Sequence, residues 1–168
     1  MKHSGMVKVF FSILIPSVFL CLMSCQTVPG ASVQQTVFGS NAETYRSKKL
    51  CTLLTKEEVG AALKIKMAEP EFFVNECTYK PVKSSSSFPG FGIQVSTDDG
   101  SGFNYNKESG KKQRRRIIEV KGIGDSAYFD DAFLNVLKGN VWLLFSAGAN
   151  PSKEAMKTLA KKAVDRLQ

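Results

Sequence analysis

Four cysteines and a single histidine are the side chains of this chain with the widest chemical range. Cys21 and Cys25 lie near the amino end, Cys51 and Cys77 lie farther along, and His3 precedes them all. A thiol can be acylated, can form a disulfide or can bind a metal, and an imidazole serves most acid–base and nucleophilic sites. Which chemistry is open to each residue depends on the segment that carries it.

The segment before Cys25 has the composition of an export signal. Two lysines precede a mostly apolar run over residues 9–23, and the small residue Ser24 adjoins Cys25. This order of basic, apolar and small residues is typical of a secretory signal peptide. A membrane-spanning helix needs about 20 apolar residues, whereas this run is shorter and a proline and a serine interrupt it. We therefore predict a signal peptide over residues 1–24.

The residues Leu22-Met23-Ser24-Cys25 resemble the lipobox of bacterial lipoproteins. The resemblance implies that the signal is cut before Cys25 and that Cys25 is diacylated on sulfur and becomes the new amino terminus. An uncleaved anchor and ordinary secretion are the alternatives. Gln26 stands where an aspartate would retain a lipoprotein at the inner membrane, which favours the outer membrane in an organism that has one. We expect a lipid-anchored protein of the cell membrane or outer membrane, with its domain facing the periplasm or the exterior.

Cleavage would change the inventory of charges and catalytic groups. Removing Lys2 and Lys8 from 23 Lys and Arg leaves 21 against 15 Asp and Glu, so the mature net charge is +6. His3 is removed as well, which excludes Ser-His-Asp and Cys-His catalysis and histidine-based zinc sites. Carboxylate pairs, Ser-Lys dyads and calcium sites stay open. From these residues we predict no catalytic residues, no metal and no cofactor.

Cys51 and Cys77 are the thiols that remain in the expected domain. An even pair in an exported domain is typical of a disulfide, and two buried free thiols are the alternative. A bridge between them would close a loop of about 27 residues, which the chain-entropy model values at roughly 3–4 kcal/mol.

The rest of the chain divides into a tether and one domain. Residues 25–47 are rich in Ser, Thr, Gln, Gly and Asn, as in a flexible tether, and residues 48–168 are long enough for one globular domain. Thr55 and Glu58 form a T-x-x-E capping box that predicts a helix start, and Asn150-Pro151 predicts the start of a final helix. Strand patterns cover residues 72–80, 91–97, 114–121, 132–138 and 141–146, whereas residues 103–113 are polar and read as irregular.

These elements predict an α+β fold. About five strands would form a mainly antiparallel sheet, with an N-terminal and a C-terminal helix on one face. Gly139-Asn140 would join the last two strands in a tight hairpin.

Three ordered motifs resemble a family of small bacterial lipoproteins of unknown function, best represented in actinobacteria. They are Cys51-Thr52-Leu53-Leu54-Thr55, Cys77-Thr78-Tyr79 and Gly122-Ile123-Gly124-Asp125-Ser126-Ala127. The resemblance covers roughly residues 48–168, although residues 100–116 depart from the usual spacing. It implies a Cys51–Cys77 bridge and an exported α+β domain, and it brings no catalytic residues.

A basic segment is the main candidate for partner binding, with five cations in six residues: Lys111, Lys112, Arg114, Arg115 and Arg116. It could bind phosphate-bearing partners such as anionic headgroups, lipopolysaccharide or an anionic wall polymer, at about 1 kcal/mol for each cation. The alternative is a solvated loop and a charged strand that protects a sheet edge. Nucleic acid is not an expected partner of an exported, tethered protein.

The remaining candidates have structural interpretations that we favour. Gly122 and Gly124 predict a tight turn in which Asp125 bonds its own backbone. The serines at 84–87 predict a loop. We favour turn formation over calcium ligation for Asp98, Asp99, Asp130 and Asp131. We favour core packing over a pocket for Tyr128, Phe129, Trp142 and Phe145.

The sequence thus favours a non-enzymatic, lipid-anchored envelope protein that binds a ligand or partner. Its expected partners are the membrane, through the lipid, and an anionic envelope component or an envelope protein. A cell-wall-acting enzyme that uses carboxylates or a Ser-Lys pair is one alternative. A structural accessory subunit of an envelope complex is the other.

Overall fold

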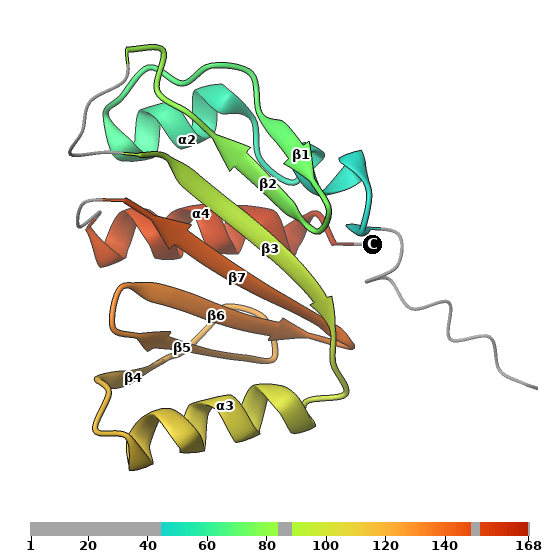
Figure 1. The fold of residues 1–168 in the computed structure, drawn as a ribbon, viewed down its shortest axis with the longest axis vertical. Helices are drawn as coiled ribbons and strands as arrows, with labels where there is room; N and C mark the ends of the chain where they lie inside the picture. Colours follow the sequence, from blue (N-terminus) through green and yellow to red (C-terminus); the bar gives the residue numbers. More distant parts are fainter. Residues whose placement is uncertain (1–44, 84–88, 149–151, 168) are drawn as a thin grey trace, which may run out of the picture. The chain divides into compact units, whose positions relative to one another are not determined.

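The computed structural model describes residues 45–83, 89–148 and 152–167 (Figure 1). The predicted signal, Cys25 and the tether up to residue 44 lie outside the described residues, as do the serines at 84–87 and Asn150-Pro151. Core packing in the described part begins at Tyr45, three residues before the expected boundary. Its side chain is buried, and its hydroxyl donates to the carbonyl oxygen of Arg166 at 3.1 Å.

The described residues form a single α+β domain around one antiparallel sheet. The sheet has seven strands in the order β1-β2-β3-β7-β6-β5-β4, rather than the expected five. The elements are η1 (Lys48–Thr52), α2 (Lys56–Leu63), β1 (Glu71–Phe73), β2 (Glu76–Tyr79), β3 (Phe91–Thr97), α3 (Ser101–Lys112), β4 (Ile117–Val120), β5 (Ser126–Asp130), β6 (Phe133–Lys138), β7 (Val141–Ala147) and α4 (Lys153–Asp165).

The capping box at the start of α2 is confirmed. Thr55 Oγ1 accepts from the backbone N–H of Glu58 at 3.2 Å, and the Glu58 carboxylate accepts from the N–H of Thr55 at 3.0 Å. These two bonds satisfy donors that the first helical turn would otherwise leave without partners. The helix ends at Lys64, whose φ of 58° breaks the helical path.

The sheet has two strands more than the sequence predicts. The expected strand over residues 72–80 is a hairpin of β1 and β2, turned at Val74-Asn75, where Val74 has a φ of 58°. The sequence also does not predict β5, which follows the turn at Gly124. A Cβ atom at Gly124 would come within 2.4 Å of the Leu137 carbonyl oxygen, so this turn requires glycine. Asp125 bonds the backbone N–H of Gly139, at 2.6 Å, and not its own backbone.

Residues 101–112 form the helix α3, although the sequence predicts an irregular segment. The carboxylate of Asp98 accepts from the backbone N–H groups of Gly102 and Phe103 and so caps the first turn from outside the helix. The buried ring of Phe103 lies edge-on to Tyr128, with 4.9 Å between ring centroids, and to Trp142, with 5.9 Å. One capped turn and one buried aromatic therefore fix a helix with little apolar periodicity.

The helices cover both faces of the sheet, not one. Successive residues of a strand point to opposite faces. On β5, Phe129 joins the main core and lies beneath Lys153 of α4, whereas its neighbour Tyr128 packs against Phe103 of α3. Helices α2 and α4 therefore lie on one face and α3 lies on the other (Figure 1).

The main core lies between the sheet and the α2–α4 layer. The N-cap of α4 is Ser152, whose hydroxyl accepts from the N–H of Ala155 at 3.1 Å, in place of the expected Asn150. The predicted apolar face of α4 is buried at Met156, Leu159, Ala160, Ala163 and Val164. Within the described ranges, no helix combines the length and the apolar character that crossing a bilayer requires.

The disulfide between Cys51 and Cys77 is confirmed, with 5.3 Å between the two Cα atoms. It ties η1 to the buried side of β2, and Cys77 is fully buried.

Candidate functional site

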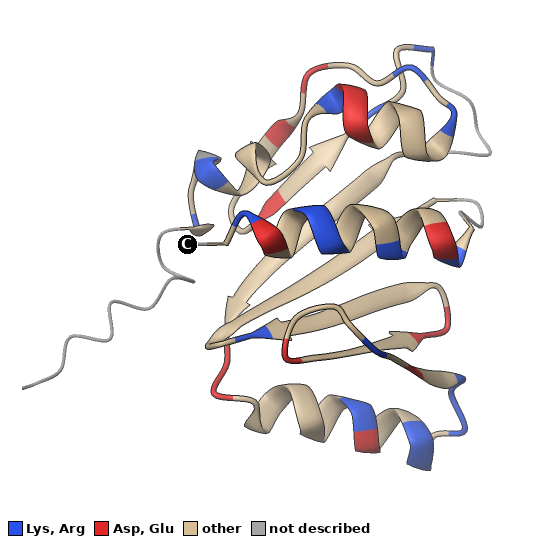
Figure 2. Cartoon of the chain, turned by 180° about the vertical axis from the view of Figure 1, so that it is seen from behind, with Lys and Arg blue, Asp and Glu red and all other residues tan. Residues whose placement is uncertain are grey.

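The five cations of the basic segment lie together at one corner of the domain, where α3 leads into β4 (Figure 2). Lys111 and Lys112 belong to the last turn of α3, where cations complement the negative end of the helix dipole. Arg114, with a φ of 60°, reverses the chain, and Arg115 and Arg116 lead into the strand. We call these five residues the basic corner.

Two members of the basic corner bind acids within the domain. Lys111 Nζ lies 2.7 Å from a carboxylate oxygen of Glu108, which is three residues earlier on α3. Arg115 donates to Asp130, which is 4% exposed at the end of β5. Among the residues that the structure describes, the buried Nε of Arg115 and the buried Oδ1 of Asp130 find no hydrogen-bond partner, so this pair is only half satisfied.

The backbone of the basic corner is clamped on both sides. Asp131 Oδ1 accepts from the N–H of Arg116 at 3.2 Å, and the N–H of Asp131 donates to the Arg116 carbonyl oxygen at 3.1 Å. Gly110 allows close packing on the other side, because a Cβ there would lie 2.8 Å from Ile117 Cδ1 and 3.2 Å from a guanidinium nitrogen of Arg115. The corner is therefore a fixed platform and not a loose loop.

Three cations of the basic corner remain for a partner: Lys112, Arg114 and Arg116. Their side chains are exposed and make no ion pair with any residue of the described part. The acids around them are already engaged, since Glu119 pairs with Lys107 at 2.7 Å and the Lys107 ammonium lowers the pKa of Glu119. Three exposed cations on a fixed backbone therefore form a candidate site for an anionic group.

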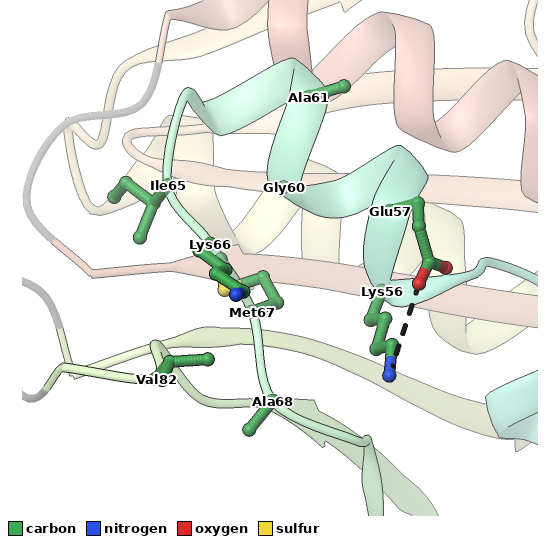
Figure 3. Close-up of a pocket in the computed structure, with 9 residues that line it drawn as sticks. All are labelled: Lys56, Glu57, Gly60, Ala61, Ile65, Lys66, Met67, Ala68 and Val82. Atoms are coloured by element: carbon green, nitrogen blue, oxygen red, sulfur yellow. Dashed lines mark ion pairs between the residues drawn. The ribbon is translucent and has the colours of Figure 1, made fainter.

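A shallow groove beside α2 is the second candidate (Figure 3). Its volume is about 560 Å³, and it is lined mainly by apolar residues: Gly60, Ala61, Ile65, Met67, Ala68 and Val82. Lys56, Glu57 and Lys66 complete the lining, and Lys56 also pairs with Glu69 outside it. Because Glu57 is the single acid of this lining, the groove does not present a pair of carboxylates.

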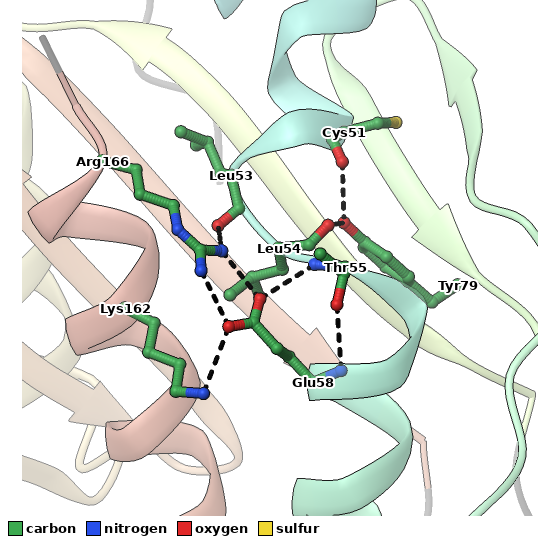
Figure 4. A network of polar contacts seen from close by, with 8 residues as sticks. All are labelled: Cys51, Leu53, Leu54, Thr55, Glu58, Tyr79, Lys162 and Arg166. Carbon is green, nitrogen blue, oxygen red and sulfur yellow. Dashed lines mark hydrogen bonds and ion pairs between the residues drawn. The ribbon is translucent and has the colours of Figure 1, made fainter.

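A network of charged residues joins α2 to α4 (Figure 4). The Glu58 carboxylate accepts from both terminal nitrogens of Arg166, at 2.7 and 2.8 Å, and from Lys162 Nζ at 3.1 Å. The bonds from Arg166, with those from Thr55 and Lys162, lower the pKa of Glu58 to about 2. Arg166 also donates to the Leu53 carbonyl oxygen at 2.8 Å. This fully bonded carboxylate serves as a structural joint.

The hydroxyl of Tyr79 extends the same joint into the core. It donates to the carbonyl oxygen of Leu54 at 2.8 Å, and burial raises the pKa of Tyr79. Tyr79, the aromatic residue of the Cys77-Thr78-Tyr79 motif, therefore holds the segment between η1 and α2 in place.

The other predicted site residues have structural roles. Asp98 caps α3, and Asp99 accepts from the N–H of Ser101 at 2.9 Å. No cluster of three or more His, Cys, Asp or Glu occurs among the described residues. Phe129 and Phe145 belong to the main core, whereas Tyr128 and Trp142 pack beneath α3, where Trp142 Nε1 donates to Asn135 at 3.1 Å.

Comparisons with protein-family models, with curated proteins and with solved structures gave no match. The geometry of the described residues therefore carries the functional interpretation.

The sequence did not reveal the two acids that organise the basic corner. Asp130 and Asp131 read as turn residues, and their partners are fifteen residues away along the chain. The β4–β5 register places Ile117 opposite Asp130, which brings Arg115 and Arg116 beside the two acids. A strand prediction over β5 would have indicated that Asp130 and Asp131 lie beside Arg115 and Arg116.

Proposed function

We propose that this protein is a lipid-anchored component of the cell envelope whose domain binds an anionic partner at the basic corner. Acylation of Cys25 is supported by the lipobox-like sequence. Binding is supported by one observation above the rest, which is that Lys112, Arg114 and Arg116 are exposed and unpaired on a clamped platform within the described part.

The basic corner lies on the side of the domain opposite to the first described residues. Tyr45, the first described residue, precedes η1 and bonds Arg166 near the end of α4. In Figure 1 these segments lie on one side of the domain, and the end of α3 that leads into β4 lies on the opposite side. A domain that turned these segments towards the membrane would present the corner to a wall polymer or an envelope molecule and not to the headgroups around its own anchor.

A binding role fits the described acids better than a catalytic role. Glu58 accepts four bonds, Asp130 bonds Arg115, and Glu57 is the lone acid of the groove. A general acid–base pair would need two carboxylates with different environments that meet around one substrate position.

The test compares two triple variants with the same change in net charge. The corner variant is Lys112→Gln/Arg114→Gln/Arg116→Gln, and the control variant replaces the exposed Lys64, Lys83 and Lys161 by Gln. Purified protein is titrated onto immobilised polyphosphate and onto lipopolysaccharide at several salt concentrations. At about 1 kcal/mol for each cation, the corner variant should lose about 100-fold in affinity and should show a weaker salt dependence.

Equal losses for the corner and control variants would contradict the proposal, because they would report net charge alone. An unchanged affinity of the corner variant would contradict it directly.

A further inference from the structure

We propose that the tip of the β1–β2 hairpin inserts into the lipid surface and orients the anchored domain. Two observations lie behind this inference. Phe73 and Val74 are exposed at the tip, and the tip lies on the side of the domain where the described chain begins. The inference rests on the proposed lipid anchor.

The hairpin tip carries two of the most exposed large apolar side chains of the described part. Phe73 is 78% exposed and its neighbour Val74 is 68% exposed. Phe73 is the last residue of β1 and pairs with Glu76, so the turn consists of Val74 and Asn75 alone. Nothing in the described domain packs over the two side chains enough to explain why they are apolar.

Val74 is also an unfavourable residue for the backbone of this turn. Its φ of 58° is a conformation that glycine or asparagine adopts readily and a β-branched residue rarely adopts. Exposure and strain together mean that folding alone would favour a different residue here. Strained backbone that the fold does not require is a reason to look for a function.

The tip lies on the same side of the domain as η1, the first described element. The segment η1 packs against β1 and β2, and Figure 1 shows the β1–β2 turn on the same side as η1 and the C-terminal end. Residues 26–44 separate Cys25 from Tyr45, and a chain of that length spans at most about 70 Å. An anchor on such a chain restricts distance but does not orient the domain, so a second contact with lipid is needed to orient it.

The size and the charges of the tip favour a lipid surface over a protein partner. One Phe and one Val expose on the order of 250 Å², whereas a stable protein interface buries about 800 Å² on each partner. The nearby acids are engaged, because Glu71 pairs with Lys80 at 2.5 Å and Glu76 accepts from Gln94 at 3.1 Å. Lys49 of η1 is exposed and adds a cation for anionic headgroups.

The orientation that follows agrees with the proposed function. With the tip in the lipid surface, the basic corner on the opposite side of the domain points away from the membrane (Figure 1). The hairpin tip and the basic corner would then work as a pair, one fixing the domain and the other meeting the partner.

The experiment uses the full acylated protein purified from membranes and reconstituted in vesicles of phosphatidylcholine with phosphatidylglycerol. Because Cys51 and Cys77 are joined and Cys25 is acylated, Val74→Cys supplies the single free thiol for an environment-sensitive fluorophore. Tyr105→Cys on α3 is the matched control, since Tyr105 is 77% exposed on another element. Flotation with the vesicles reports the anchor, and quenching by brominated lipid reports insertion.

The proposal expects blue-shifted, strongly quenched emission from position 74 and unchanged emission from position 105. Protein that floats while position 74 stays in water overturns the inserted tip and leaves the anchor standing. Protein that does not float overturns both. A blue shift at position 74 that needs no vesicles and grows with protein concentration identifies a second copy as the occupant and overturns the lipid proposal.

A second variant tests the strain at the tip. Val74→Gly removes a strained side chain without packing, so the folding equilibrium constant should rise about fivefold in urea unfolding. A fall would mean that Val74 contributes to folding, and the functional interpretation of this residue would be overturned.

Discussion

The two ends of the sheet are held together in different ways. At the β1–β3 end, the Cys51–Cys77 disulfide and the Glu58–Arg166 joint fasten η1, α2 and α4 to one another and to the sheet. At the β4–β5 end, within the described residues, no disulfide is present, and the pair of half-buried Arg115 with buried Asp130 leaves one polar atom on each side without a partner.

Charged residues therefore have a structural role at the first end, and at the second end they have the binding role that we propose. The Glu58 carboxylate of the first joint accepts four bonds, so its oxygens have no capacity left for a ligand. At the second end the Arg115–Asp130 pair and the backbone bonds between Arg116 and Asp131 hold the basic corner, and three neighbouring cations stay exposed. The same residue types therefore stabilise one end and, in the function that we propose, supply the binding groups at the other.

The largest expected effect comes from breaking the covalent link at the first end. Cys51→Ser with Cys77→Ser should lower the free energy of unfolding by about 3–4 kcal/mol, because the unfolded chain regains the entropy of a closed loop. Urea unfolding under oxidising conditions measures the change. An unchanged midpoint would contradict the claim that this link holds the first end.

The next largest effect tests the half-satisfied pair at the second end. Arg115→Ala leaves the Asp130 carboxylate buried without its cation, and we expect a loss of about 2–3 kcal/mol in the free energy of unfolding. The double variant Arg115→Leu/Asp130→Leu should recover most of that loss, because no buried charge remains. If both variants unfolded like the parent protein, the pair would not hold the corner.

A smaller effect with a distinct pH profile is expected for the joint at the first end. Glu58→Gln should cost about 1–2 kcal/mol at neutral pH, where the carboxylate is charged. The pKa of Glu58 falls from an ordinary value of 4.5 to about 2 in the folded domain. Its contribution is therefore complete above about pH 4.5 and is lost as the pH falls towards 2.

Urea unfolding at a series of pH values checks this profile. The difference between parent and Glu58→Gln should shrink across that acid window, and a constant difference would contradict the joint.

The smallest effect on stability is expected for the exposed cations of the basic corner. Lys112→Gln/Arg114→Gln/Arg116→Gln should change the free energy of unfolding by no more than about 0.5 kcal/mol, because these side chains make no ion pair in the described part. Thermal unfolding provides the measurement. A large loss would place the three cations among the stabilising groups and would weaken their assignment to binding.

Local signals in the sequence predicted several elements of the first end. The capping box of Thr55 and Glu58, the paired cysteines and the alternation over β3 each act within a few residues or through a covalent bond. The hairpin of β6 and β7 also forms at Gly139-Asn140, as predicted.

The second end could not be predicted in the same way, because long-range contacts form it. Helix α3 contains Gly102 and Gly110 and depends on a cap from Asp98 and on the burial of Phe103 against β5 and β7. The partner of Arg115 is set by the β4–β5 register. The cations of the site were visible in the sequence, but the acids that hold them in place were not.

Mass spectrometry of the native protein, isolated from membranes, tests the central claim most directly. The account predicts a mature chain that begins at an acylated Cys25, without residues 1–24. An acyl-free chain that begins at Met1 and is recovered from the cytosolic fraction would contradict it.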